Sequence, residues 1–226
     1  MEKSKADPRR SPHLVVIDGA QSGMVASLWT HPNPSSGDPW QVLDRMFSGP
    51  LLSPKQVQVA WIKHAQSMPA MEGEFPEHTR KLAEYITVTL RRLRERFPNL
   101  RVAYLSSRIY GGYAATPLNP EPYAYEGAFA VRWVIQSQIQ GEQKLNFDPM
   151  KGPVTAPAVL WGPYLWADGV KPRKLDGLVW TKDDLGGDGT HPSAAGRAKV
   201  AGLLLDFLHN NPLASCWYMT QQPAKD

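Results

Sequence analysis

The sequence predicts an α/β protein built on a mainly parallel sheet, with helices on both faces of that sheet. Short apolar runs of strand length alternate along the chain with longer segments of helical periodicity. Strands separated by helices favour right-handed crossovers between parallel strands. The 226 residues are enough to bury a full core, so we expect one domain over 1–226, with a polar N-terminal segment at 1–12 and a C-terminal tail at 213–226.

An apolar run at residues 14–17 opens this alternation. It ends in a turn-rich segment from Asp18 to Gly23, so it predicts a buried strand that meets a loop. Similar apolar runs recur later in the chain and are also followed by polar or turn-forming residues. These later strands are expected at residues 57–62, 101–105 and 157–161.

Helices are expected between and after these strands. The longest covers residues 78–97 and is closed by Pro98 and Asn99. Shorter helices are expected at residues 25–29, 40–47 and 126–140. The last helix ends near Pro212, and five apolar residues at i, i+3, i+4, i+7 and i+8 spacing predict one buried face: Val200, Leu203, Leu204, Phe207 and Leu208.

The composition is that of a folded protein and excludes several classes of site and partner. A single cysteine, Cys216, excludes an internal disulfide and a cysteine-based metal cluster. The net charge is only +4, and the arginines of the long helix alternate with apolar residues. That pattern is typical of a solvated helix face, so nucleic acid is not expected as a partner.

No segment predicts insertion into a membrane or export. The chain has no run of about 18 apolar residues, so we expect no membrane span. Residues 1–10 are polar and do not resemble a signal peptide. The chain as given is therefore expected to be cytoplasmic, and exported if the native N-terminus lies upstream.

The most informative motif is Asp188-Gly-Thr-His191-Pro-Ser, immediately before the last helix. In serine-type hydrolases a carboxylate orients a histidine, and the histidine takes the proton of the nucleophile. The alternative interpretation is a simple Asp-Gly turn leading into a helix. Under the first interpretation, a carboxylate oxygen of Asp188 should lie within hydrogen-bond distance of a ring nitrogen of His191.

Polar residues at the expected strand ends favour the catalytic interpretation. In parallel α/β folds the loops after the carboxyl ends of the strands converge on one crevice. We therefore expect the segments beginning at Asp18, Lys63 and Ser106 to open on one edge of the sheet, together with the Asp188 loop.

With these motifs, the chain resembles the SGNH (GDSL-type) hydrolases, which cleave esters on a flavodoxin-like, three-layer α/β/α sandwich. The Asp188 to His191 motif resembles the family's fifth block, where Asp and His three residues apart belong to the catalytic triad. Residues 15–23 are similar to the second block, which implies an oxyanion-binding N–H at Gly23. Residues 56–66 are placed like the third block, which in the family ends in an oxyanion-hole Asn.

The chain departs from the family pattern in its third block. It offers His64 or Gln66 where the family has Asn. The side-chain amide of Gln66 is the better substitute, because it can donate to an oxyanion. Histidine can donate as well, but a lone histidine is more often structural.

The greater departure is that no Gly-Asp-Ser block and no strand precede residues 15–23, although the family's nucleophile belongs to that block. In one interpretation the chain is an N-terminally shortened relative that lacks its first strand and serine. A sheet without its central strand is then expected to recruit a partner strand, giving a homo-oligomer. In the other, Ser22 is a stand-in nucleophile. The first is favoured because Ser22 occupies the second-block position.

The resemblance implies ester hydrolysis without a metal or organic cofactor, on a small-molecule or carbohydrate ester. We expect an acylated carbohydrate, because aromatic rings near the site stack well on sugar faces, although such rings also serve plain packing. Arg108 is suited to binding a carboxylate or phosphate, or to pairing with Glu121 or Asp168.

The rival hypothesis is a non-catalytic carbohydrate-binding or interaction domain on a degenerate hydrolase scaffold. The aromatic candidates are Tyr110, Tyr113, Tyr123, Tyr125, Trp161, Tyr164, Trp166 and Trp180.

Overall fold

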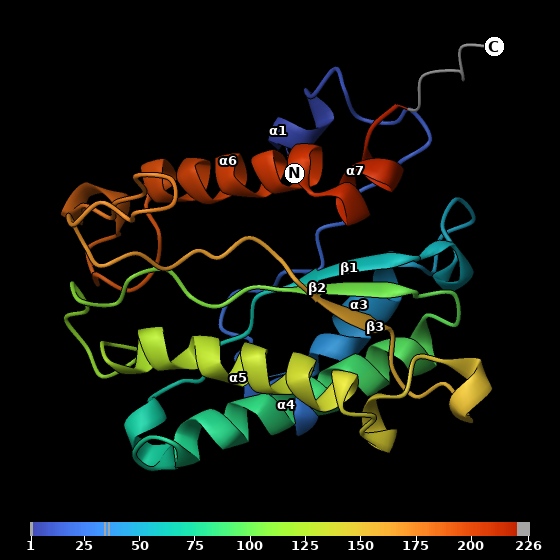
Figure 1. Ribbon diagram of the computed structural model, residues 1–226, viewed down its shortest axis with the longest axis horizontal. Coiled ribbons are helices and arrows are strands. Elements are labelled where there is room, and N and C mark those ends of the chain that lie inside the picture. The colour runs from blue at the N-terminus through green and yellow to red at the C-terminus, as the bar shows by residue number, and fades with distance from the viewer. Residues whose placement is uncertain (1, 34, 36, 221–226) are drawn as a thin grey trace.

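Three short parallel strands form the centre of the structure, a computed structural model that describes residues 2–33, 35 and 37–220 (Figure 1). The strands β1 (Val59–Ile62), β2 (Val102–Leu105) and β3 (Ala158–Trp161) lie in the order β1-β2-β3. Ile62 pairs with Leu105, and Leu105 pairs with Trp161, so all three carboxyl ends lie at the same edge. The expected α/β class and these three strands are confirmed.

Two long helices, α4 (Glu77–Arg96) and α5 (Tyr123–Ile139), cover one face of the sheet together with α2 (Ala26–Thr30). Alternate strand residues, among them Ala103 and Leu105, join the buried core of these helices. Helix α5 begins at Tyr123, three residues before the expected start at 126, and Pro122 precedes it. A proline at this end costs nothing, because the first N–H groups of a helix have no partner within it.

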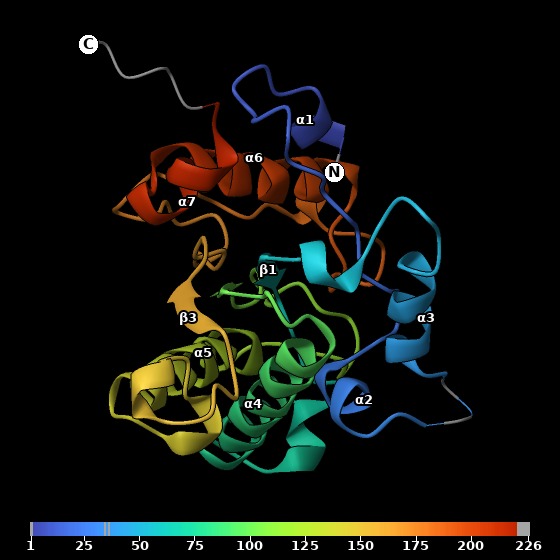
Figure 2. The same cartoon turned by 90° about the vertical axis from the view of Figure 1, so that its right-hand side faces the viewer.

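The opposite face of the sheet is contacted by α6 (Ala194–Asn210) and α7 (Pro212–Tyr218), as Figures 1 and 2 show. Tyr104 of β2 provides the contact: its ring packs on Phe207, and its hydroxyl donates to the Leu213 carbonyl at 2.7 Å. Helix α7 occupies most of the described part of the expected C-terminal tail at 213–226. That segment is therefore helical up to Tyr218.

The expected buried face of the last helix is only partly buried. Gly196 is the one buried residue of α6, and all five predicted apolar residues keep intermediate exposure: Val200, Leu203, Leu204, Phe207 and Leu208. The physical reason is that the neighbours of α6 cover this face only in part. Val200 and Leu203 pack against a small cluster that includes Leu165 and Trp180, and Phe207 contacts the ring of Tyr104.

The prediction of a strand at residues 14–17 was wrong. This segment is irregular, and the side chain of Val15 is 66% exposed. A strand exists only when a neighbour completes its hydrogen-bond ladder. Among the described residues no strand pairs with this segment, so its apolar composition alone does not make it a strand.

The remaining helices are short: α1 (Glu2–Lys5) is the first element of the chain, and α3 (Pro39–Met46) lies between α2 and β1. Helix α3 lies at the position expected for residues 40–47. No helix in the described ranges is long and apolar enough to span a membrane. The remaining elements are the 3-10 turns η1 (Pro54–Gln56), η2 (Pro69–Glu72), η3 (Gln143–Leu145), η4 (Pro149–Lys151) and η5 (Lys182–Asp184).

Candidate functional site

Asp188 and His191 form the predicted hydrogen bond. The Nδ1 atom of His191 lies 2.5 Å from Oδ2 of Asp188, while Oδ1 accepts the backbone N–H groups of Thr190 and His191 at 3.0 Å each. The hydrogen bond from the His191 ring and these two N–H groups lower the pKa of Asp188 to about 2. The carboxylate therefore stays ionised and favours the His191 tautomer that carries its proton on Nδ1.

This tautomer leaves Nε2 of His191 as the proton acceptor. The side chain is 67% exposed, so solvent or a ligand reaches the ring. In the described part of the chain, no residue forms a hydrogen bond to Nε2. The described residues thus supply an oriented base and its carboxylate, but no hydroxyl that is hydrogen-bonded to the base.

The loop that carries this pair is fixed at its tip by close backbone packing. Gly189 has a φ of 63°, and a Cβ atom there would lie 1.8 Å from the carbonyl oxygen of Tyr113. Only glycine fits this position, because it lacks the Cβ atom and tolerates positive φ. The carbonyl of Asp188 accepts the N–H of Ala115 at 3.0 Å. The segment after β2 therefore holds the pair from one side.

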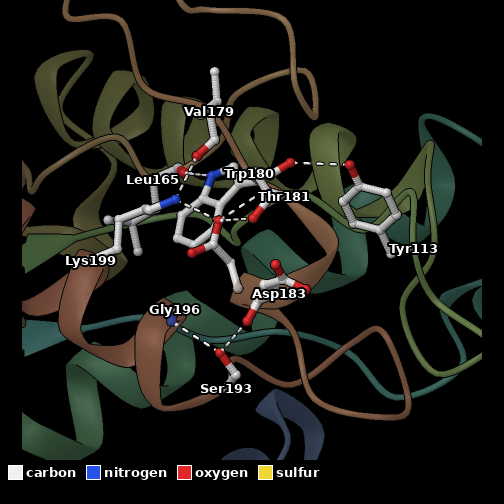
Figure 3. A network of polar contacts seen from close by, with 10 residues as sticks. Tyr113, Leu165, Val179, Trp180, Thr181, Asp183, Ser193, Gly196 and Lys199 are labelled. Atoms are coloured by element: carbon white, nitrogen blue, oxygen red, sulfur yellow. Dashed lines mark hydrogen bonds and ion pairs between the residues drawn. The ribbon is translucent and has the colours of Figure 1, made fainter.

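A polar network anchors the base of the same loop to α6 (Figure 3). Asp184 accepts from Lys199 at 2.5 Å and from the backbone N–H and hydroxyl of Thr181. Burial alone would raise the pKa of Asp184, but the hydrogen bond from Lys199 and those from Thr181 hold it below its ordinary value. Ser193 caps α6 by accepting the Gly196 N–H, while its hydroxyl donates to the Asp183 carbonyl at 2.7 Å.

The exit of β1 carries Lys63, His64 and Gln66. Gln66 is buried, and its side-chain amide donates to the His78 carbonyl at 2.8 Å. One of its two amide hydrogens is therefore already bonded to α4. His64 packs against Trp29, and its Nδ1 is buried without a partner. Burial and the neighbouring charge of Lys63 lower the pKa of His64 to about 4, so its ring is neutral at pH 7.

The exit of β2 carries Ser106, Ser107 and Arg108. The hydroxyl of Ser106 donates to the Pro163 carbonyl at 2.8 Å, whereas Oγ of Ser107 is buried without a partner. Arg108 is buried and donates from Nη2 to the Thr190 carbonyl at 2.7 Å. This bond joins the end of β2 to the loop of His191. The β1 and β2 exits and the Asp188 loop therefore meet at one edge, as expected.

Ser22 and Gly23 lie in an exposed turn before α2. Gly23 adopts a φ of 75°, and the N–H of Ala26 donates to the Ala65 carbonyl, which places this turn next to the exit of β1. Among the described residues Ser22 makes no hydrogen bond to His191. The expectation that the segment from Asp18 leaves the sheet as a strand end was wrong, because residues 14–17 are not a strand.

The aromatic candidates divide into exposed and buried rings. Trp161 is 39% exposed and Tyr164 is half-buried, so both are accessible. Trp180 was wrongly expected at the site mouth: it is fully buried, and its indole N–H donates to the Leu165 carbonyl at 2.9 Å. Four further rings form a continuous chain beside the Asp188 loop: Tyr113, Tyr110, Trp166 and Tyr125.

Three residues at this edge of the sheet do not stand out in the sequence. Lys63 and Ser107 were seen only as polar residues after strands, because the sequence does not show which atoms lack partners. Glu121 was considered only as a partner for Arg108. In the structure it accepts from the N–H groups of Gly111 and Tyr125 and from the Trp166 indole, so it organises the aromatic chain instead.

Neither described cavities nor metal-binding clusters mark this site. A surface hollow of about 360 Å³ lies at the end of α5, lined by Ser137, Gln140, Gly141, Glu142 and Gln143, away from the Asp188 loop. No group of three or more His, Cys, Asp or Glu residues in the described ranges is arranged to hold a metal ion.

A scan against protein-family models and searches of curated proteins and of solved structures found no match to this chain.

Proposed function

We propose that this protein is a serine-type ester hydrolase of the SGNH class, acting on an acylated carbohydrate. The observation that carries the proposal is the 2.5 Å hydrogen bond from Nδ1 of His191 to Asp188, on a loop held by the ends of β2 and α6. That arrangement matches the acid and base of a hydrolytic triad in geometry and in the direction of the Asp188 pKa shift. A flavodoxin-like, three-layer sandwich belongs to the same proposal.

In the proposed reaction, His191 takes the proton of a serine hydroxyl through Nε2 as that oxygen attacks the ester carbonyl. Asp188 stabilises the imidazolium that forms, and His191 then protonates the leaving alcohol. Water next attacks the acyl-enzyme with His191 again as the base. Donors for the oxyanion come from the Gly23 N–H and from the segment after β1, where His64 and Gln66 lie.

The nucleophile is proposed to come from a further strand that precedes residues 14–17 in a longer form of the chain. Two observations support this. No described hydroxyl is hydrogen-bonded to His191, and residues 14–17 are apolar yet have no strand beside them. A further parallel strand has the free edge of β1 to pair with. It would also end at the edge where His191 lies.

The test is an esterase assay with p-nitrophenyl acetate on the chain as given and on a version extended by the upstream coding sequence. We expect little or no turnover by the short chain and restored turnover by the extended one. His191→Ala should lower the restored rate by several orders of magnitude, because triad members act as a unit. Robust turnover by the short chain that disappears in Ser22→Ala would instead identify Ser22 as the nucleophile.

One observation favours a second candidate, a non-catalytic carbohydrate-binding domain: exposed rings such as Trp161 and Tyr125 accompany a histidine with no nucleophile beside it. Under that hypothesis the extended chain still lacks esterase activity, while Trp161→Ala weakens sugar binding.

A further inference from the structure

Two cationic side chains beside the Asp188 loop form no ion pair with any residue that the structure describes. Lys63 directly follows β1 and Arg108 follows β2, and the pairing of Ile62 with Leu105 brings both to the same edge. In the described ranges neither residue has a carboxylate oxygen within 4.0 Å. Like charges placed together without a counter-charge are unfavourable unless another group neutralises them.

The carboxylates nearest to Arg108 are committed to other donors. Glu121 accepts from two backbone N–H groups and the Trp166 indole, and Asp188 accepts from His191 and Thr190. Burial lowers the pKa of Arg108 to about 10, and the negative charges of Glu121 and Asp188 oppose this shift. Neither carboxylate forms an ion pair with Arg108 or Lys63, so among the described residues the Nε–H of Arg108 keeps no acceptor.

Unpaired polar atoms are concentrated at this edge. Among the described residues, six buried side-chain nitrogen or oxygen atoms lack a hydrogen-bond partner. Four of them lie here, since Asn119 donates to the Gln66 carbonyl at 3.2 Å and so belongs to the exit of β1. A buried polar atom without a partner is costly, and such atoms are normally satisfied by water or a ligand. The four atoms are Nδ1 of His64, Oγ of Ser107, Nε of Arg108 and Oδ1 of Asn119.

Lys63 is the member of this group that lies at the surface. This residue keeps an exposed surface, although enough protein surrounds it that burial, together with the charge of Arg108, lowers its pKa to about 8. It is therefore mostly protonated at pH 7. A ligand that reaches Lys63 has the buried donors of Ser107 and Arg108 behind it, with Arg108 91% removed from solvent.

We propose that Lys63, Ser107 and Arg108 form a subsite for an anionic oxygen group, a carboxylate or a sulfate, on the substrate. The Lys63 ammonium, the Ser107 hydroxyl and the Arg108 Nε–H each donate to its oxygens, as charge-assisted hydrogen bonds require. Arg108 also holds the Thr190 carbonyl, so the bound anion lies next to the loop of His191. The inference deepens the proposed function, on which it rests for the ligand being a carbohydrate ester.

The experiment compares the binding of D-glucuronate, glucose 6-sulfate and neutral glucose by isothermal titration calorimetry at constant ionic strength. We expect at least about tenfold tighter binding of an anionic sugar than of glucose. The sugar that binds more tightly identifies whether carboxylate or sulfate is the natural group. Lys63→Met and Ser107→Ala should each weaken that binding by about tenfold, whereas Lys144→Met, which removes an exposed lysine in η3, should not change it.

A substitution of Arg108 also disturbs its bond to the Thr190 carbonyl, so the wild-type chain provides the second readout. The ¹⁵N-bound Nε–H resonance of Arg108 should shift on addition of the anionic sugar and remain unchanged with glucose. Equal affinity for glucose and both anionic sugars, unchanged affinity in Lys63→Met, or an unmoved Arg108 resonance would overturn the subsite. Anion binding by an extended chain without esterase activity would support the subsite and overturn the hydrolase proposal alone.

Discussion

At the scale of single residues, the contact that defines the site is the hydrogen bond between Asp188 and His191. Its geometry depends on a short loop in which one carboxylate oxygen accepts two backbone N–H groups and the other accepts the imidazole. The backbone N–H groups fix the carboxylate before any ligand arrives. The carboxylate thereby orients the imidazole through Nδ1, and the exposed ring leaves Nε2 open to a ligand.

The pKa of Asp188 tests this arrangement directly. In a carbon-detected NMR titration, we expect the Asp188 carboxyl to titrate near pH 2. His191→Ala should raise that midpoint toward the ordinary value of about 3.9, because it removes the largest stabilising interaction of the ionised form. The exposed His13 provides the control, since His13→Ala should leave the Asp188 midpoint unchanged.

The same shift has a defined sign for stability. The folded pKa lies below the unfolded one, so the pair contributes to the free energy of unfolding above about pH 4. That contribution is lost as the pH falls through about 2. A wild-type Asp188 that titrates near pH 4 would mean that the hydrogen bond to His191 is not formed in solution.

At the scale of elements, the junction between η5 and α6 positions the loop of the pair. Asp184 joins the two, because its carboxylate binds Lys199 of α6 and its carbonyl accepts the N–H of Ser193. The first turn of α6 lies directly against the same carbonyl. A Cβ atom at Gly196 would be 2.0 Å from it.

Two glycines of α6 give a matched test of this junction. Gly196→Ala should lower the free energy of unfolding by at least about 2 kcal/mol, because the new methyl group overlaps a backbone oxygen. At Gly202 an added Cβ atom would meet no neighbouring atom within 4 Å. Gly202→Ala should therefore raise the free energy of unfolding by up to about 1 kcal/mol through helix propensity. Urea denaturation measures both. Similar effects of the two substitutions would show that α6 does not dock on η5 in this way.

At the scale of the whole molecule, the first described segment of the chain contacts the last two helices. The carboxylate of Asp7 accepts from Nε2 of His209 at 2.6 Å and from the Tyr218 hydroxyl at 2.9 Å. Arg9 hydrogen-bonds to the other nitrogen of His209. Figure 2 shows α1 beside α6 and α7 as a result. These helices are joined to the sheet chiefly through Tyr104, which contacts both α6 and α7.

Tyr104→Phe tests how firmly this unit is held to the sheet. The change removes the donor to the Leu213 carbonyl and the acceptor of the Trp217 indole N–H. We expect a loss of about 1–2 kcal/mol in the free energy of unfolding, because both groups lose a partner in a partly buried place. Tyr125→Phe is the control. Its exposed hydroxyl has no hydrogen bond among the described residues, so the expected change is below about 0.5 kcal/mol. Equal losses of unfolding free energy in Tyr104→Phe and Tyr125→Phe would show that the hydroxyl of Tyr104 does not hold α6 and α7 to the sheet.

The sequence by itself determined the elements whose signal is local. Three strands and the long helices were predicted to within a few residues, since apolar runs, helical spacing and terminal prolines act over short distances. The contact of Asp188 with His191 was predictable for the same reason, because a three-residue loop limits the separation of the two side chains.

Only the tertiary structure decided what depends on neighbours distant in the chain. Residues 14–17 have the composition of a strand but no described strand to pair with, so they are irregular. The apolar side of α6 remains half-buried, because burial depends on what covers a helix and not on its own periodicity. One amide hydrogen of Gln66 is bonded to the His78 carbonyl, while Ser107 and Arg108 have buried polar atoms without a partner. Which groups form hydrogen bonds depends on which residues lie close together in the folded chain, and the spacing of residues along the sequence does not show this.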